Sequence, residues 1–287
     1  MQLAMPLPSI ARRALAGAAG LLVLLVVEWY LVFHVRAIEH LDATAYYGFL
    51  GLSTRPHVSA VALRVANLCN PVPYVFLAAV PVLVALLRRR PLVAGAILLI
   101  LVGANLSTAL LKPLLAAVRP DGLPVWQVFP GSWPSGHGTA SMSLALCAVL
   151  AAPRRWRPYV AALGAAFAIA VCYSFLTLGW HYPSDAFAGL LVASIWTLFG
   201  IALVSILDAR RTTGVERRTP APAVGRALMP SVLAAGAFVL IAAIIVLLRP
   251  EGVAAYIGGH HAFLAGAAAL AAAALSLPAG VMLTMRR

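Results

Sequence analysis

Long apolar runs, each about the length that crosses a bilayer, dominate the chain. A helix needs about 20 mostly apolar residues to span the hydrocarbon. Eight segments meet this requirement: Ala14–Val35, Val65–Leu87, Leu92–Leu111, Gly136–Ala152, Tyr159–Leu178, Pro183–Leu207, Ala227–Leu248 and Ala262–Thr284. They are apolar throughout and do not alternate with polar residues, as strands of a membrane barrel would. The pattern therefore predicts an all-α polytopic membrane protein with eight spans.

Composition excludes the soluble classes of protein. Residues of the set AVILMFWYC make up 63% of the 287 positions, charged residues make up 10%, and mean hydropathy is +0.96. A soluble domain cannot bury this much apolar side chain, and disorder requires low hydrophobicity. The three cysteines stand singly in apolar stretches, so neither a disulfide framework nor a thiolate metal site is expected.

The basic residues predict the orientation of the spans. With the N-terminus inside, 15 of the 21 lysines and arginines fall in cytoplasmic segments. The other six are Arg36, Arg55, Arg64, Lys112, Arg119 and Arg249. We therefore expect a multi-pass protein of the cytoplasmic membrane with both termini in the cytoplasm. The net charge of +13 then reflects contacts with anionic lipid headgroups, and no nucleic-acid partner is expected.

Two basic residues and one helix start on the predicted outer side suit an anionic ligand. Lys112 and Arg119 follow the third span, and Ser135-Gly136 opens the fourth. Taken singly, the cations can be interfacial anchors and Ser135 a helix cap. Together they supply positive charge, a hydroxyl and backbone amides at a helix N-terminus, which is a phosphate-binding arrangement.

Two histidines on the same side complete a candidate catalytic group. His137 lies in the first turn of the fourth span, where it can pass a proton to a leaving oxygen. His181 and Asp185 are four residues apart at the start of the sixth span. The carboxylate can accept one ring N–H and leave the other nitrogen free to attack phosphorus.

These segments resemble the three signature motifs of the type 2 phosphatidic acid phosphatase (PAP2) superfamily. The matching residues are Lys112-x6-Arg119-Pro120, Pro134-Ser135-Gly136-His137 and Ser174-x6-His181-x3-Asp185. The resemblance covers about residues 60–207 and implies a PAP2-like catalytic core of six membrane helices over residues 1–207. A cytoplasmic linker (208–226) and a two-helix transmembrane extension (227–287) would follow. The small residues of that extension favour close packing against the core or a second copy of the chain, as in a homo-oligomer.

The resemblance also implies roles for the site residues. His181 would be the nucleophile that forms a phosphohistidine, Asp185 would orient it, and His137 would protonate the leaving group. Phosphate oxygens would be bound by Lys112, Arg119, Ser135, Gly136 and Ser174. The family acts on lipid phosphates without a metal or other cofactor, and its members of this topology have an extracytoplasmic site.

One position departs from the motif. The family normally has arginine after the serine of the third motif, and this chain has Phe175. Losing a guanidinium that binds phosphate costs on the order of 10²–10³ in rate. Arg36, Arg55 or Arg64 can replace the missing cation, or the substrate can differ, or the enzyme can be weak.

Three functions remain open on the sequence alone. The first is a lipid phosphate or diphosphate phosphatase, with polyprenyl diphosphate, phosphatidic acid, phosphatidylglycerophosphate or a polyprenyl-phosphosugar as substrate. The second is a phosphotransferase that passes the phosphoryl group to an acceptor hydroxyl. The third, suggested by Phe175, is a lipid-phosphate binder or transporter without turnover.

Two further outer-side residues carry weaker predictions. Glu28 lies within the first span, where an ionisable group is costly, and either pairs with an arginine near the site or stays protonated. Trp133 has the composition of an interfacial residue that guides a lipid tail.

Overall fold

The computed structural model describes residues 7–115, 131–211, 236, 255–256 and 258–285, and the regular elements of these residues are helical. The α-helices are α1 (Ser9–His34), α2 (Arg36–Gly51), α3 (Pro56–Ala66), α4 (Pro71–Leu87), α5 (Pro91–Leu115), α6 (Gly136–Ala151), α7 (Arg157–Thr177), α8 (Pro183–Arg211) and α11 (His261–Thr284). Two short 3₁₀ helices, η1 (Leu52–Thr54) and η2 (Asn67–Cys69), flank α3.

The helices confirm a multi-pass membrane protein. Five of them are long and apolar enough to cross a bilayer, namely α1, α5, α7, α8 and α11. The pair formed by α3–η2 and α4 provides a sixth span if it is counted as one, bent by 58°. The helix α6 is apolar but has only 16 residues. The expected span Ala227–Leu248 lies outside the described residues, so the predicted number of eight remains a prediction.

The break between α3 and α4 follows from local sequence. Pro71 is the first residue of α4, and a proline disfavours helical dihedral angles in the residue before it. Asn70 accordingly has extended backbone angles, φ −68° and ψ 154°. The expected span Val65–Leu87 is therefore interrupted near its start, and its regular part begins at Pro71.

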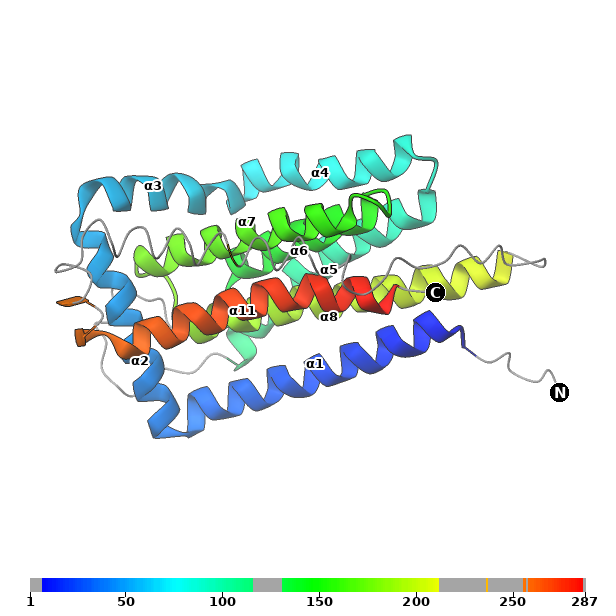
Figure 1. Ribbon diagram of the computed structural model, residues 1–287. Helices are drawn as coiled ribbons and strands as arrows, with labels where there is room; N and C mark the ends of the chain where they lie inside the picture. The colour runs from blue at the N-terminus through cyan, green and yellow to red at the C-terminus, as the bar shows by residue number, and fades with distance from the viewer. Residues whose placement is uncertain (1–6, 116–130, 212–235, 237–254, 257, 286–287) are drawn as a thin grey trace.

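The segment expected to be an outer loop is largely helical. The helix α2 has a buried face that includes Glu39, Asp42 and Tyr46, while His40 and Tyr47 are exposed on its other side. This amphipathic pattern suits a helix that lies across the end of a bundle. Figure 1 shows α2 at one end of the long helices, whereas α1 begins and α11 ends at the other.

The helix α6 forms the centre of the bundle. It packs against α5, α7 and α8, and most of its residues are buried. Serine, alanine and glycine predominate in its first half, so neighbouring backbones can approach closely. As a result, the starts of α6 and α8 touch, and the backbone N–H of Ser135 donates to the carbonyl oxygen of Asp185 over 2.8 Å.

The last helix packs on the same bundle. It contacts α2, α7 and α8, and Figure 1 shows it running beside α8. The hydroxyl of Tyr173 donates to the carbonyl of Ala267 over 2.5 Å, and the ring of Phe263 meets Phe49 edge-on at 4.7 Å. Of the two predicted modes of packing, docking onto the core is therefore the one seen for α11.

Candidate active site

His181 and Asp185 form a hydrogen-bonded pair at the start of α8. The Nδ1 atom of His181 lies 3.3 Å from Oδ2 of Asp185, and the same oxygen accepts the backbone N–H of Tyr182 over 3.0 Å. Asp185 is fully buried and His181 is 7% exposed. Because Nδ1 is engaged by the carboxylate, Nε2 is the ring nitrogen left for other chemistry.

The first turn of α6 borders this pair. The hydroxyl of Ser135 accepts the backbone N–H of Gly138 over 3.2 Å and caps the helix. A Cβ atom placed on Gly136 would have no neighbour within 4 Å, so the space beside this glycine is open. A ligand can therefore approach the helix N-terminus, which favours anions through its free N–H groups.

His137 faces the same region from α6. Its ring centroid lies 6.4 Å from that of His181, close enough for both rings to contact one phosphoryl group. The ammonium group of Lys112, at the end of α5, interacts electrostatically with both His137 and Asp185. The structure thus brings together four predicted residues from three segments; Arg119 lies outside the described residues.

Phe175 occupies the position next to the two imidazoles. Its side chain is fully buried, with the ring centroid 5.1 Å from His181 and 6.0 Å from His137. Ser174, the preceding residue, donates its hydroxyl to the carbonyl of Ala170 over 2.7 Å, within its own helix. In this arrangement the hydroxyl of Ser174 is used by α7, and its predicted contact with phosphate stays a prediction.

The three arginines considered as replacements are all exposed residues of the segment from α2 to α3. None of Arg36, Arg55 and Arg64 forms a hydrogen bond or ion pair with a residue that the structure describes. The cation among the described residues that interacts with the site is therefore Lys112.

A sequence comparison with known families decides the relationship. Residues 92–209 match the family model of the PAP2 superfamily. This stretch belongs to the PAP2 superfamily. It contains all three motif segments and the helices α5 to α8 that carry them.

Among solved structures, the chain is similar to a transmembrane PAP2-type phosphatidylglycerolphosphate phosphatase from Bacillus subtilis. The TM-score is 0.56 at 20% sequence identity, and the match covers 69% of this chain and 98% of the other. At this identity the likeness is one of fold. No curated protein matches the sequence.

Outside the PAP2 match, α2 holds the loop that carries the nucleophile candidate. Asp42 accepts the backbone N–H of Ser184 over 3.0 Å and its hydroxyl over 2.5 Å, at the start of α8. Tyr46 donates to the carbonyl of Gly179 over 3.3 Å. Burial raises the pKa of Tyr46 to about 12, so this phenol stays a neutral donor at physiological pH. Sequence reasoning missed both residues, although their spacing of four on an amphipathic segment was a usable signal.

A second support of the PAP2 motifs comes from α1. The indole N–H of Trp133 donates to Oε2 of Glu28 over 3.0 Å, just before the Pro134-Ser135 turn. Trp133 is 1% exposed, so the prediction of an interfacial residue was wrong. It is packed inside because its indole reaches a carboxylate that α1 places at this depth, and Phe33 meets it edge-on at 6.3 Å.

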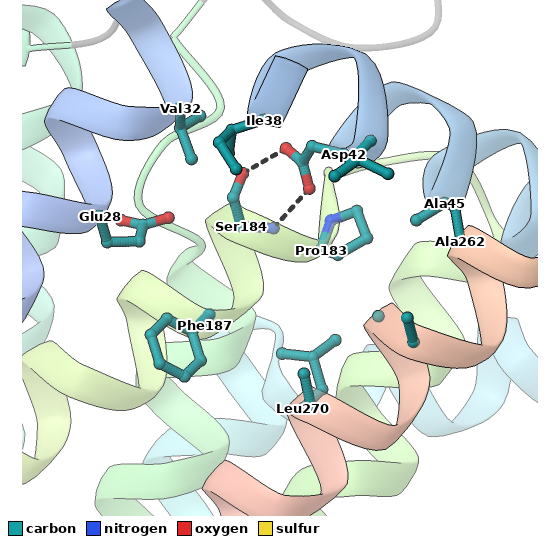
Figure 2. A pocket seen from close by; sticks show the side chains of 14 residues that line it. Glu28, Val32, Ile38, Asp42, Ala45, Pro183, Ser184, Phe187, Ala262 and Leu270 are labelled. Carbon is teal, nitrogen blue, oxygen red and sulfur yellow. Dashed lines mark hydrogen bonds between the residues drawn. The ribbon is translucent and has the colours of Figure 1, made fainter. Parts of the chain in front are cut away.

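A cavity lies on another side of the first turn of α8. Figure 2 shows it between α1, α2, α8 and α11, with a volume of about 330 Å³. Its walls are mostly apolar, and Glu28, Asp42 and Ser184 are its polar lining residues. Ser184 lines the cavity and the next residue, Asp185, holds His181, so one helical turn connects the two places.

Metal-ligating side chains are not concentrated anywhere in the described residues. No group of three or more His, Cys, Asp or Glu that could hold a metal ion occurs among them. The candidate site consists of two imidazoles, one carboxylate and one ammonium group, which supplies a nucleophile, a proton donor and positive charge.

Proposed function

We propose that the protein is a metal-independent phosphatase of lipid phosphates that acts through a phosphohistidine at the extracytoplasmic face. One observation carries the proposal: His181 has its Nδ1 on Asp185 and its ring 6.4 Å from His137. A nucleophile held by a carboxylate and facing a second proton-transfer group is the arrangement that phosphoryl transfer in two steps requires.

In the first step, Nε2 of His181 attacks phosphorus. The P–N bond forms as the bond from phosphorus to the lipid oxygen breaks, and protonated His137 gives its proton to that oxygen. Asp185 stabilises the positive charge that develops on the ring of His181. Lys112, Arg119 and the N-terminus of α6 bind the phosphoryl oxygens.

In the second step, water replaces the imidazole on phosphorus. Neutral His137 accepts a proton from the attacking water, the new P–O bond forms and the P–N bond breaks. Inorganic phosphate leaves, and both histidines return to their starting states. An acceptor hydroxyl in place of water gives the phosphotransferase reaction, so product analysis with and without an acceptor lipid separates the two.

The substrate is a lipid because the site belongs to a membrane bundle. The PAP2 match and the fold shared with a phosphatidylglycerolphosphate phosphatase favour a glycerophospholipid monoester among the four candidate headgroups. The buried Phe175 favours the competing function, a lipid-phosphate binder without turnover, because it leaves the pocket one cation short of the family motif.

The test is phosphate release by the purified protein in EDTA from a panel of those lipids. We expect release from at least one of them, complete loss in His181→Ala, and unchanged rates in His57→Ala, an exposed histidine of α3. Brief reaction with a ³²P-labelled lipid should give acid-labile label on the wild type and none on His181→Ala. Full activity of the His181 variant would end the nucleophile assignment, and binding without release would establish the competing function.

A further inference from the structure

The side chain of Asn70 makes an unusual choice of partner. Asn70 is the N-cap residue of α4, a position where asparagine usually accepts a backbone N–H of its own helix. It makes no such bond. Its Oδ1 instead lies 3.0 Å from Nε2 of His137, a residue 67 positions away on α6.

The amide of Asn70 is fixed on its other side as well. Its Nδ2 donates to Oδ1 of Asn67 over 3.0 Å, and its backbone N–H donates to the Asn67 carbonyl over 3.1 Å. These bonds arise in the break between α3 and α4, where the chain bends by 58°. With Nδ2 used in this way, Oδ1 is presented to the imidazole as an acceptor.

We infer that Asn70 is a positioning residue for His137 in the proposed phosphatase, fixing which ring nitrogen exchanges the catalytic proton. Oδ1 accepts Nε2–H in the neutral and the protonated ring alike, so Nδ1 is the atom that gains and loses the proton. When the lipid oxygen leaves, the proton moves from Nδ1 to that oxygen; when water attacks, it returns to Nδ1. The inference rests on the proposed function.

The remaining neighbours of His137 do not provide this acceptor. Phe175 and Trp180 contribute ring contacts at 6.0 and 5.4 Å, and His181 and Lys112 interact with it electrostatically. An imidazolium needs an acceptor for each N–H, and burying one without a partner costs free energy. Asn70 therefore supports the protonated form of His137 as well as its orientation.

The leaving group provides a readout that a structural role would not affect. Phosphatidic acid releases a strongly basic alkoxide and needs the acid, whereas 4-nitrophenyl phosphate releases a weakly basic phenolate and does not. We expect Asn70→Leu to lower kcat/KM for phosphatidic acid by about tenfold to a hundredfold, and for the aryl ester by less than about threefold. Asn70→Asp should recover most of the loss, because its carboxylate accepts the same N–H.

Asn105→Leu is the matched control. Asn105 is half-buried on α5 and bonds Tyr74 and Leu101, away from both histidines. It should change both substrates by the same factor. A loss in Asn70→Leu that is equal for the two substrates, or no loss at all, would overturn the inference.

A measurement without turnover separates this inference from the proposed function. In ¹⁵N-histidine-labelled protein, the His137 resonances, assigned with His137→Gln, should show the neutral ring protonated on Nε2. Asn70→Leu should shift the population towards the other tautomer. An unchanged tautomer contradicts the inference even if the enzyme is active, whereas a shifted tautomer in a protein that hydrolyses neither substrate refutes only the proposed function.

Discussion

Phe175 is the residue whose chemistry most affects the candidate site. The ring is fully buried between two imidazoles, where the PAP2 motif would supply a guanidinium. An aromatic ring within about 6 Å can stabilise a cation on its neighbour, but it offers no hydrogen bond to phosphate. The described residues therefore leave Lys112 to neutralise the phosphoryl charge from the protein side.

Phe175→Arg should raise hydrolysis of a lipid phosphate monoester. The new guanidinium would lie beside His181 and donate to the phosphoryl oxygens, and one such donor is worth on the order of 10²–10³ in kcat. Because the arginine must also be accommodated in a packed position, we expect a gain of about tenfold in kcat/KM, measured as phosphate release in EDTA.

Phe175→Leu is its control, since it removes the ring and adds no charge. It should not increase activity. An arginine variant that folds with the wild-type thermal stability and shows no gain would mean that the wild-type pocket is already complete, so the loss of the motif arginine would have no catalytic cost.

At this scale the sequence predicted residues that carry chemistry better than residues that hold them. His137, His181, Asp185 and Lys112 were predicted from type and spacing, and the structure brings them together. Asn70 was not predicted, because its role depends on a bend between two helices that hydropathy treats as one run. No spacing rule connects positions 67 residues apart.

Among the elements, the contact between α6 and α8 is what sets the positions of the two histidines. A Cβ atom on Gly189 would lie 2.6 Å from the carbonyl oxygen of Ser135 and 2.9 Å from the backbone nitrogen of Thr139. Both atoms belong to the start of α6, which cannot yield as a flexible side chain can. Glycine at this position therefore allows the two helices to touch.

Gly189→Ala should separate the helices, destabilise the protein and lower activity. Overpacking of this kind typically costs about 1–3 kcal/mol, and a shift of the α6 backbone moves His137 away from His181. The measurement is thermal unfolding in detergent together with phosphate release. Gly95→Ala on α5, where an added Cβ meets nothing within 4 Å, is the control and should be neutral or slightly stabilising. An unchanged melting temperature in the Gly189 variant would contradict this account of the contact.

Hydropathy predicted the long helices closely and the short ones poorly. The expected span Pro183–Leu207 corresponds to α8, Pro183–Arg211, which continues four residues into the segment assigned to the linker. By contrast, α2 was missed because its polar side chains reduce its hydropathy, yet it supplies Asp42 and Tyr46 to the loop around His181. Amphipathic helices that cover the end of a bundle require a moment rather than a mean, and their partners come only from tertiary packing.

On the scale of the whole molecule, chemistry and basic charge lie at opposite ends. The candidate site and α2 lie towards one end, while the turns that carry Arg88–Arg90 and Arg154–Arg157 lie at the other (Figure 1). The positive-inside rule places the arginine-rich end in the cytoplasm. The separation along the bundle, combined with this rule, supports an extracytoplasmic site.

Thiol labelling in intact cells tests this orientation directly. The native cysteines Cys69, Cys147 and Cys172 are buried, so they should react little with a membrane-impermeant maleimide. Thr54→Cys, exposed beside α2, should be labelled in intact cells, whereas Arg155→Cys, exposed in the turn before α7, should be labelled only after permeabilisation. The reverse pattern would place the site in the cytoplasm and overturn the predicted orientation, while His181→Ala would still test the chemistry. Labelling of both variants after permeabilisation is the control, because it shows that each cysteine is accessible to the reagent on its own side.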